Sequence, residues 1–205
     1  MRKNYVARKP AEQAVSREDI LLAAADVFRA QGYHGAKMAD IASEVDLTAG
    51  SLYHHFPAGK QQILREVLNN GLDMVTEHVR KIVEDPDLSP PEKLKKAIYA
   101  HVTALTENPS VAAALVFETR NILNDQEGRD AYLKRRDIFE NLYQQVIQDG
   151  IDSGVFKPVD VDIFTKTLLG AHNWIGVWYR PEGRLSGADI AATIADIFLQ
   201  ALLQR

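Results

Sequence analysis

Residues 38–60 constrain this chain most strongly, because their pattern predicts two short helices joined by a tight turn. Ile41 and Val45 lie one helical repeat apart and give the first helix a narrow apolar face. Asp46 follows, and aspartate tolerates the left-handed backbone that suits a sharp corner. Thr48 is a natural N-cap residue and predicts the start of the second helix.

The second of these helices carries side chains suited to DNA. Leu52 and Phe56 are spaced i, i+4, so they would anchor the helix to its own domain and leave its polar residues outside. Hydroxyls, imidazoles and helix N-terminal amides form hydrogen bonds with phosphates and base edges. A short helix with these side chains is typical of helices that enter the major groove of DNA. The alternative is a small helical corner with a polar outer face. The outward residues are Thr48, Ala49, Ser51, Tyr53, His54 and His55.

A supporting helix is predicted before this pair. Ser16 and Asp19 have the spacing of a capping box, and Gly32 is expected to end the helix. The segment before Ser16 is basic, and a basic arm can reach phosphates or a minor groove. The alternative is a solubilising terminus that does not contact DNA. The cations of this segment are Arg2, Lys3, Arg8 and Lys9.

Residues 16–65 resemble the DNA-binding domain of TetR-family transcriptional regulators. The resemblance rests on Gly32-Tyr33, Asp40-Ile41-Ala42, Leu47-Thr48, Gly50-Ser51-Leu52-Tyr53-His54-His55-Phe56 and Lys60. It implies an all-α homodimer with an N-terminal three-helix domain for DNA and a larger C-terminal domain for ligand binding and dimerisation. It also implies phosphate contacts from Tyr53, His54 and Lys60. The predicted DNA-binding residues are Lys37, Thr48, Ala49, Ser51, Tyr53, His54 and Lys60.

Three departures from the family pattern affect this region. Ala36 and Lys37 stand where the family often has a capping Thr or Ser, so the next helix is expected to be weakly capped. Asp46 replaces a common Gly. The segment 57–59 puts one more residue before Lys60 than the commonest form has, which affects the reach of that lysine.

Charge is distributed unevenly along the chain. The 205 residues carry a net charge of −4, which by itself argues against a DNA partner. Residues 1–60 nevertheless hold 8 Lys and Arg against 7 Asp and Glu, whereas the remainder holds 16 against 21. A DNA-binding face needs local positive charge rather than a basic whole, so this balance is compatible with DNA.

Composition also bounds the class of protein. Residues 7–20 contain Arg, Lys, Pro and Glu where a signal peptide needs an apolar core, and no apolar run reaches the length of a membrane span. The absence of cysteine excludes disulfides and cysteine-based zinc sites. Metal-binding histidine patterns and Gly-rich phosphate loops are also missing from the sequence. We therefore expect a cytoplasmic protein that is not an enzyme, does not enter a membrane and needs no metal or cofactor.

The rest of the chain is predicted to be helical, which gives about nine helices in all. The long helix at 60–84 would join two domains, residues 1–62 for DNA and residues 63–205 for ligand and dimerisation. The further helices are predicted at 89–107, 109–123, 129–153, 160–179 and 186–203.

The last two of these helices are predicted to form the dimer interface. Both carry apolar residues on more than one side, and such helices need more than one neighbour. A four-helix bundle formed by two subunits across a two-fold axis supplies the additional neighbours. The alternative is burial of both helices inside a monomer. The two main apolar faces consist of Phe164, Leu168, Ala171, Ile175 and Trp178, and of Ile190, Ile194, Ile197, Phe198 and Ala201.

The middle helices are predicted to enclose a small molecule. Mostly apolar pockets with a few polar groups are the usual form of such sites. For each candidate side chain the alternative is ordinary core packing. The candidates are His101, Phe117, Arg120, Phe139, Tyr143, Asn173, Trp174 and Trp178.

A second resemblance concerns the ligand. Segments such as Arg135-Arg136-Asp137, Asn173-Trp174 and Trp178-Tyr179 resemble the C-terminal domain of TetR regulators of fatty-acid and steroid catabolism. It implies an acyl-CoA effector, whose phosphates would meet the cations at 134–136; the alternative for these cations is a solvated face. The favoured interpretation is a repressor that an effector releases from a palindromic operator. The alternatives are a repressor that senses drugs or aromatic compounds and a helical interaction protein that does not bind DNA.

Overall fold

A computed structural model describes residues 15–124 and 126–203, and within this range the chain forms ten α-helices and no strand. The predicted all-α fold is therefore confirmed. The helices are α1 (Arg17–Gly35), α2 (Met38–Glu44), α3 (Ala49–His55), α4 (Gly59–Val83), α5 (Pro90–Glu107), α6 (Pro109–Phe117), α7 (Thr119–Leu123), α8 (Gln126–Asp152), α9 (Val161–Trp178) and α10 (Gly187–Leu202). The basic arm predicted at Arg2, Lys3, Arg8 and Lys9 lies outside the described residues.

Four of the helices that begin where predicted have a side chain that caps the start. The Thr48 hydroxyl accepts a hydrogen bond from the backbone N–H of Ser51 at 3.1 Å, which satisfies one of the free amides at the start of α3. Lys37 has no acceptor to offer α2, and instead the Asp40 carboxylate accepts from the Lys37 N–H at 2.9 Å. The caps predicted at Ser16 and Thr48 are confirmed, and Asp160 and Ser186 cap α9 and α10 at the predicted starts of those helices.

Two residues adopt left-handed backbone near the first helices. Asp46 has a φ of 55°, which confirms the sharp corner predicted between α2 and α3. Gly32 has a φ of 70° but does not end α1, because the helix resumes after this kink and continues to Gly35. The predicted end at Gly32 is therefore wrong by one turn.

The single helix predicted at 109–123 is also wrong, because it divides at Glu118 into α6 and α7. The Glu118 side chain is buried, and its carboxylate accepts a hydrogen bond from the backbone N–H of Tyr33 at 3.0 Å. It also accepts from the Asn121 amide at 2.7 Å. A contact with α1 therefore accompanies this break, and local sequence does not reveal it.

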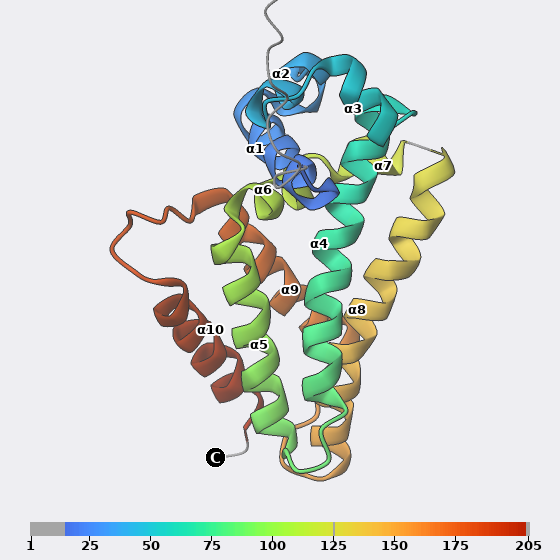
Figure 1. Cartoon of the computed structure of the whole chain (residues 1–205). Coiled ribbons are helices and arrows are strands. Elements are labelled where there is room, and N and C mark those ends of the chain that lie inside the picture. The colour runs from blue at the N-terminus through green and yellow to red at the C-terminus, as the bar shows by residue number, and fades with distance from the viewer. Residues whose placement is uncertain (1–14, 125, 204–205) are drawn as a thin grey trace, which may run out of the picture.

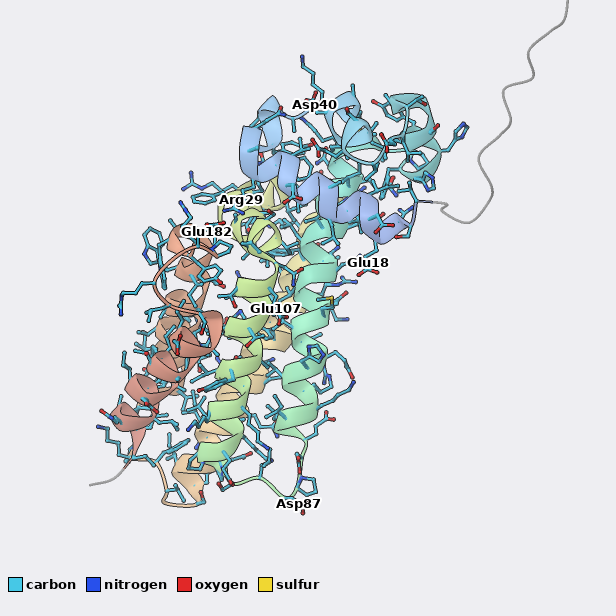
Figure 2. The ribbon with its side chains drawn as sticks, turned by 60° about the vertical axis from the view of Figure 1, so that its left-hand side comes forward. Glu18, Arg29, Asp40, Asp87, Glu107 and Glu182 are labelled. Carbon is cyan, nitrogen blue, oxygen red and sulfur yellow. The ribbon has the colours of Figure 1, made fainter. Side chains whose placement is uncertain are left out.

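The helices form two parts that share α4. Figure 1 shows α1, α2 and α3 gathered at one end, while α4 continues from them alongside α5 and α8. In the turned view of Figure 2, Asp40 of α2 and Asp87 lie at opposite ends of the molecule. The predicted boundary between residues 62 and 63 falls in the first turn of α4, so the division remains a prediction.

Helix α6 fits tightly between two helices of the second part. A Cβ atom at Gly71 of α4 would lie 2.6 Å from Val111, and one at Gly176 of α9 would lie 2.8 Å from the carbonyl oxygen of Ala112. Glycine is therefore needed at both crossings. The same helix packs against α1, so it links the two parts of the chain. Among the described residues, no helix combines the length and apolar character needed to cross a membrane.

Candidate functional site

The second helix of the helix-turn-helix presents the predicted polar face to solvent. Leu52 and Phe56 are fully buried and fix α3 to the domain, whereas Tyr53 is 50% exposed. Thr48, His54 and Lys37 are exposed, and Ala49 and Ser51 are half-buried. The Tyr53 ring packs against Gly59, where a Cβ atom would lie 3.3 Å from the ring and where φ is +68°.

Lys60, which was predicted to bind a phosphate, makes contacts within the chain. Its Nζ donates hydrogen bonds to the carbonyl oxygens of Tyr33 and Ala36, and it lies 4.4 Å from the centre of the Tyr33 ring. These carbonyls lie at the C-terminal end of α1, where free acceptors favour a cation. The side chain therefore closes the α1–α2 connection, and two of its three protons have acceptors within the chain.

Arg17 holds α3 in place through contacts that the local sequence pattern does not predict. Its guanidinium donates two hydrogen bonds to the Glu66 carboxylate, at 2.8 and 2.5 Å, and a third to the carbonyl oxygen of His55 at 2.6 Å. It also lies 4.1 Å from the centre of the Phe56 ring. Since Glu66 is 49 residues away in sequence, no local pattern could have revealed this contact.

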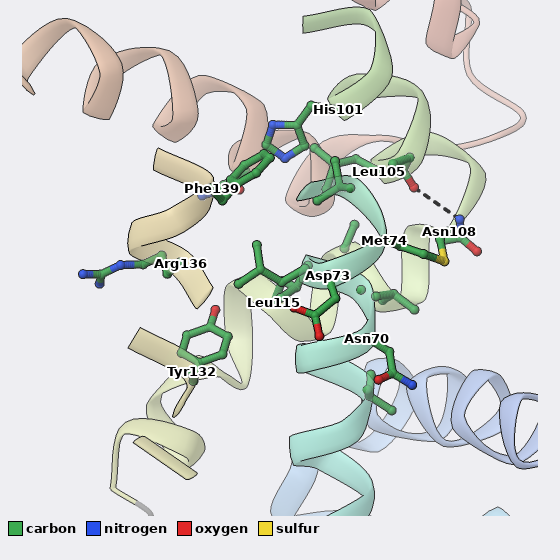
Figure 3. Close-up of a pocket in the computed structure, with 18 of the residues that line it drawn as sticks. Asn70, Asp73, Met74, His101, Leu105, Asn108, Leu115, Tyr132, Arg136 and Phe139 are labelled. Atoms are coloured by element: carbon green, nitrogen blue, oxygen red, sulfur yellow. Dashed lines mark hydrogen bonds between the residues drawn. The ribbon is translucent and has the colours of Figure 1, made fainter. Parts of the chain in front are cut away.

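A cavity of about 760 Å³ lies among the helices of the second part of the chain, and four residues of α1 also border it. Figure 3 shows that its walls come from several helices, with Met74, Leu105 and Leu115 among the apolar side chains. This volume lies within the range typical of small-molecule sites. The charged and amide side chains that also line it are Arg17, Glu18, Asn70, Asp73, Asn108, Arg136, Glu140, Lys166 and Asn173.

Three of the eight side chains predicted to bind ligand line this cavity, namely His101, Phe139 and Asn173. Tyr143 is buried in the core instead, and its hydroxyl donates to the carbonyl oxygen of Ala97 at 3.0 Å. Arg120 lies outside the cavity.

Trp174, Trp178 and Phe117 are placed away from the cavity that the prediction assigned to them. The two tryptophans are 60% and 45% exposed on the outer side of α9. Phe117 is 59% exposed and borders a smaller hollow of about 350 Å³ with Arg29 and Arg180. Helical periodicity identifies an apolar face, but it does not say what that face contacts.

The predicted cationic cluster on α8 is divided by the structure. Arg136 lines the cavity and donates to the neighbouring Asp137 at 3.0 Å. Arg135 lies outside the cavity wall and is paired with Asp73, with both distances from its Nε to the carboxylate at 3.1 Å. Of these two arginines, only Arg136 borders the cavity, and Figure 3 shows its guanidinium directed away from the interior.

Two buried histidines meet where α5 and α9 border the cavity. The Nδ1 atoms of His101 and His172 lie 2.9 Å apart, and the Phe139 ring packs edge-on against His101 at a centroid distance of 4.9 Å. Burial lowers the pKa of His101 to about 3. Burial, together with the neighbouring His101, also holds the pKa of His172 well below its ordinary value. Both imidazoles are therefore neutral at physiological pH.

The comparison with known families matches both parts of this architecture. Residues 20–67 match the family described as bacterial regulatory proteins, tetR family. Residues 87–202 match the tetracyclin repressor-like C-terminal domain, which covers more than half of the chain. The chain belongs to the TetR family. It is therefore a DNA-binding transcriptional regulator that dimerises and responds to a small molecule, and it is not an enzyme.

Several TetR-family relatives cover nearly the whole chain. The HTH-type transcriptional repressor KstR2 of Mycolicibacterium smegmatis is 29% identical over 197 residues, which are 95% of this chain and 94% of the relative. The solved structure of KstR2 of Mycobacterium tuberculosis, described as a ketosteroid transcriptional regulator, has a TM-score of 0.83 at 27% identity and covers 95% of this chain and 99% of that one. AibR, solved in complex with isovaleryl coenzyme A and operator DNA, has a TM-score of 0.72 at 28% identity, with 91% and 97% covered.

In this TetR-family chain, two contacts join the part that holds the cavity to the DNA-binding part. The Ser110 hydroxyl of α6 donates to the Asp26 carboxylate of α1 at 2.5 Å. At the other end of α6, Glu118 accepts from the Tyr33 N–H. Sequence reasoning found neither contact, because the partners are separated by 84 and 85 residues.

Proposed function

We propose that this protein is a cytoplasmic repressor that leaves a palindromic operator when an acyl-CoA occupies the cavity. The observation that carries the proposal is the position of the cavity. Its wall includes Arg17 and Leu21 of α1 as well as residues of α6. A ligand there would touch both the DNA-binding part and the helix that links it to the rest of the chain.

On the DNA side, we assign the contacts to the exposed face around α3. Tyr53 and His54 would bind phosphates, while Thr48, Ala49 and Ser51 would face base edges. Exposed Lys37 lies at the start of α2 and adds a phosphate contact. In a two-fold dimer, the two copies of α3 would enter successive major grooves about 34 Å apart.

The dimer is proposed to form through the outer faces of α9 and α10. Ile163 and Trp174 of α9 are 61% and 60% exposed, and Ile197 of α10 is 59% exposed. Large apolar side chains exposed together on neighbouring surfaces are typical of a protein interface. Leu168 and Ile175, which were predicted to lie on the interface-forming face of α9 together with Phe164, Ala171 and Trp178, are instead buried within the chain.

The cavity fits an acyl-CoA in its distribution of side chains. Apolar residues such as Leu105 and Leu115 would surround the acyl chain. Arg136 and Lys166 are the cations of α8 and α9 that border the same cavity, where the Arg136 guanidinium is directed outward and Lys166 is already paired with Glu140 and Asp162. The complex of AibR with isovaleryl coenzyme A supports this ligand class for a relative of the same fold.

Coupling between ligand and DNA is proposed to pass through α1, α4 and α6. Leu21 of α1, Val67 of α4 and Val111 of α6 all border the cavity. A ligand that moves α6 would change the contacts with Asp26 and Tyr33 and so reorient α1. Allosteric coupling is typically worth about 1–3 kcal/mol, and the upper half of that range gives a tenfold or larger loss of DNA affinity.

Calorimetric titration with a series of straight-chain acyl-CoAs and their free acids tests this ligand class. Each added methylene should tighten binding by roughly fourfold until the cavity is full. The free acids should bind much more weakly, because they lack the phosphates. Binding of free acids as tight as that of the thioesters, or binding only of cationic or aromatic drugs, would contradict the acyl-CoA assignment.

A further inference from the structure

The histidine pair at the wall of the cavity has no part in DNA binding or in the proposed dimer. His101 comes from α5 and His172 from α9, and both are buried. Their Nδ1 atoms are 2.9 Å apart, a hydrogen-bonding distance. Two neutral rings can form this hydrogen bond only if one Nδ1 carries a proton and the other is unprotonated and accepts it.

The remaining nitrogen of His172 decides which ring carries the shared proton. Its Nε2 is buried and has no hydrogen-bond partner among the described residues. An unpartnered buried N–H is rarer in proteins than an acceptor that lacks a donor. His172 therefore carries its proton on Nδ1, which donates to His101, and its bare Nε2 is the atom left without a partner.

This assignment fixes the proton of His101 on Nε2. His101 lines the cavity, and Figure 3 shows its imidazole with one ring nitrogen directed toward the interior of the pocket. That nitrogen is Nε2, since Nδ1 is engaged by His172. The structure thus places an N–H donor in a mostly apolar wall formed by neighbours such as Phe139 and Leu105.

We infer that His101 determines effector specificity by donating its Nε2–H to an uncharged acceptor, such as a carbonyl oxygen, and that His172 is the residue that positions it. An uncharged ring cannot compensate a carboxylate, whose transfer into an apolar wall is costly without a paired cation. The inference rests on the proposed function in one respect, because the acceptor would be the thioester carbonyl of the acyl-CoA.

The tautomers can be measured without any ligand. Long-range ¹H–¹⁵N spectra of the histidine-labelled protein at pH 7 should show His101 as the Nε2–H form and His172 as the Nδ1–H form. His172→Asn keeps an amide nitrogen near the position of Nδ1 and should preserve the His101 tautomer, whereas His172→Leu should yield a mixture. An Nδ1–H or charged His101 in the unaltered protein would overturn the inference.

The role in specificity is tested with two matched probes, octanoyl-CoA and S-octyl-CoA, in which a methylene replaces the carbonyl. The unaltered protein should bind the thioester roughly tenfold more tightly than the thioether. His101→Leu should abolish this preference, while His101→Gln, which retains a donor near Nε2, should keep most of it. Equal affinity for the two probes, or a preference that survives in His101→Leu, would overturn the inference.

A probe without CoA separates this inference from the proposed function. If neither CoA compound binds, the acyl-CoA assignment fails, and the His101 signal is then followed during titration with cyclohexanone or methylenecyclohexane, which differ in their C=O and C=CH₂ groups. A larger shift of the Nε2–H resonance with the ketone supports the donor role. Equal shifts, or none with either compound, would contradict it.

Discussion

The carboxylate of Glu118 accepts a hydrogen bond from the backbone N–H of Tyr33 at 3.0 Å, across the junction between the cavity-bearing helices and α1. The carboxylate is buried, and the preceding residue of α1, Gly32, is the point at which that helix kinks. This contact holds the last turn of α1 against the end of α6. It therefore lies on the proposed route by which a ligand would influence α1 and the helix-turn-helix of α2 and α3.

Glu118→Ala should weaken the coupling between ligand and DNA. Loss of the carboxylate leaves a main-chain amide without this acceptor, at a cost of about 1–3 kcal/mol, and frees α1 from α6. The ratio of operator affinities with and without effector should fall at least threefold. Glu118→Gln keeps an acceptor oxygen and serves as the control. If the alanine variant has the same ratio of operator affinities as the unaltered protein, this route is wrong.

Lys60→Ala should lower both folding stability and operator affinity. The ammonium group donates to two main-chain carbonyls, so its removal leaves both without this donor. We expect a loss of about 1–3 kcal/mol in the free energy of unfolding, measured by urea titration. Exposed Lys95 on α5 provides a control, since Lys95→Ala should change neither quantity.

Tyr53→Phe should weaken operator binding and leave stability unchanged. The ring packs against Gly59 in both forms, while only the hydroxyl, proposed to bind a phosphate, is lost. The loss should be similar for specific and nonspecific DNA, because phosphate contacts do not read sequence. Anisotropy titrations with both duplexes measure it, and equal affinities for the variant and the unaltered protein would exclude this contact.

Ile197→Glu should disrupt the dimer. This side chain is 59% exposed on α10, and a carboxylate in a desolvated interface would cost several kcal/mol. Light scattering should then report a monomer or an aggregate. Val155, which is 38% exposed outside α9 and α10, offers a matched control in Val155→Glu; a fully dimeric Ile197→Glu protein would place the interface elsewhere.

Folding stability should fall as the pH is lowered from 7 to 5. The pKa of His101 is about 3 in the folded chain, and that of His172 is also lowered, whereas both rings titrate near 6.5 when unfolded. Between these values the unfolded chain binds more protons, so acidification favours unfolding. Each histidine should contribute up to about 2 kcal/mol at pH 5. His101→Phe combined with His172→Leu should flatten this dependence, and an unchanged slope would contradict neutral burial.

The separation in sequence between two contacting residues explains which features could be predicted. The Thr48 cap joins residues three apart, so its pattern is visible locally, as is the corner at Asp46. The pairs Arg17–Glu66, His101–His172 and Glu118–Tyr33 join residues 49, 71 and 85 positions apart. No periodicity specifies such partners, because each depends on how whole helices pack.

In the candidate site, too, features set by local sequence were predictable and features set by the packing of distant helices were not. The polar outer face of α3 followed from local spacing, and the structure exposes Tyr53 and His54 as expected. The ligand residues were less predictable, because an apolar helical face looks the same whether it meets the core, a cavity or another subunit. Trp174 and Trp178 were therefore assigned to the cavity, although they lie on the outer side of α9.

Release of operator DNA by acyl-CoA is the most direct test of the account. An operator selected from random duplexes would be labelled, and its Kd measured by anisotropy with and without saturating thioester. We expect at least a tenfold rise in Kd with the thioester that binds most tightly, and little change with the matching free acid. A Kd that stays constant with every acyl-CoA while the thioester occupies the protein would contradict it.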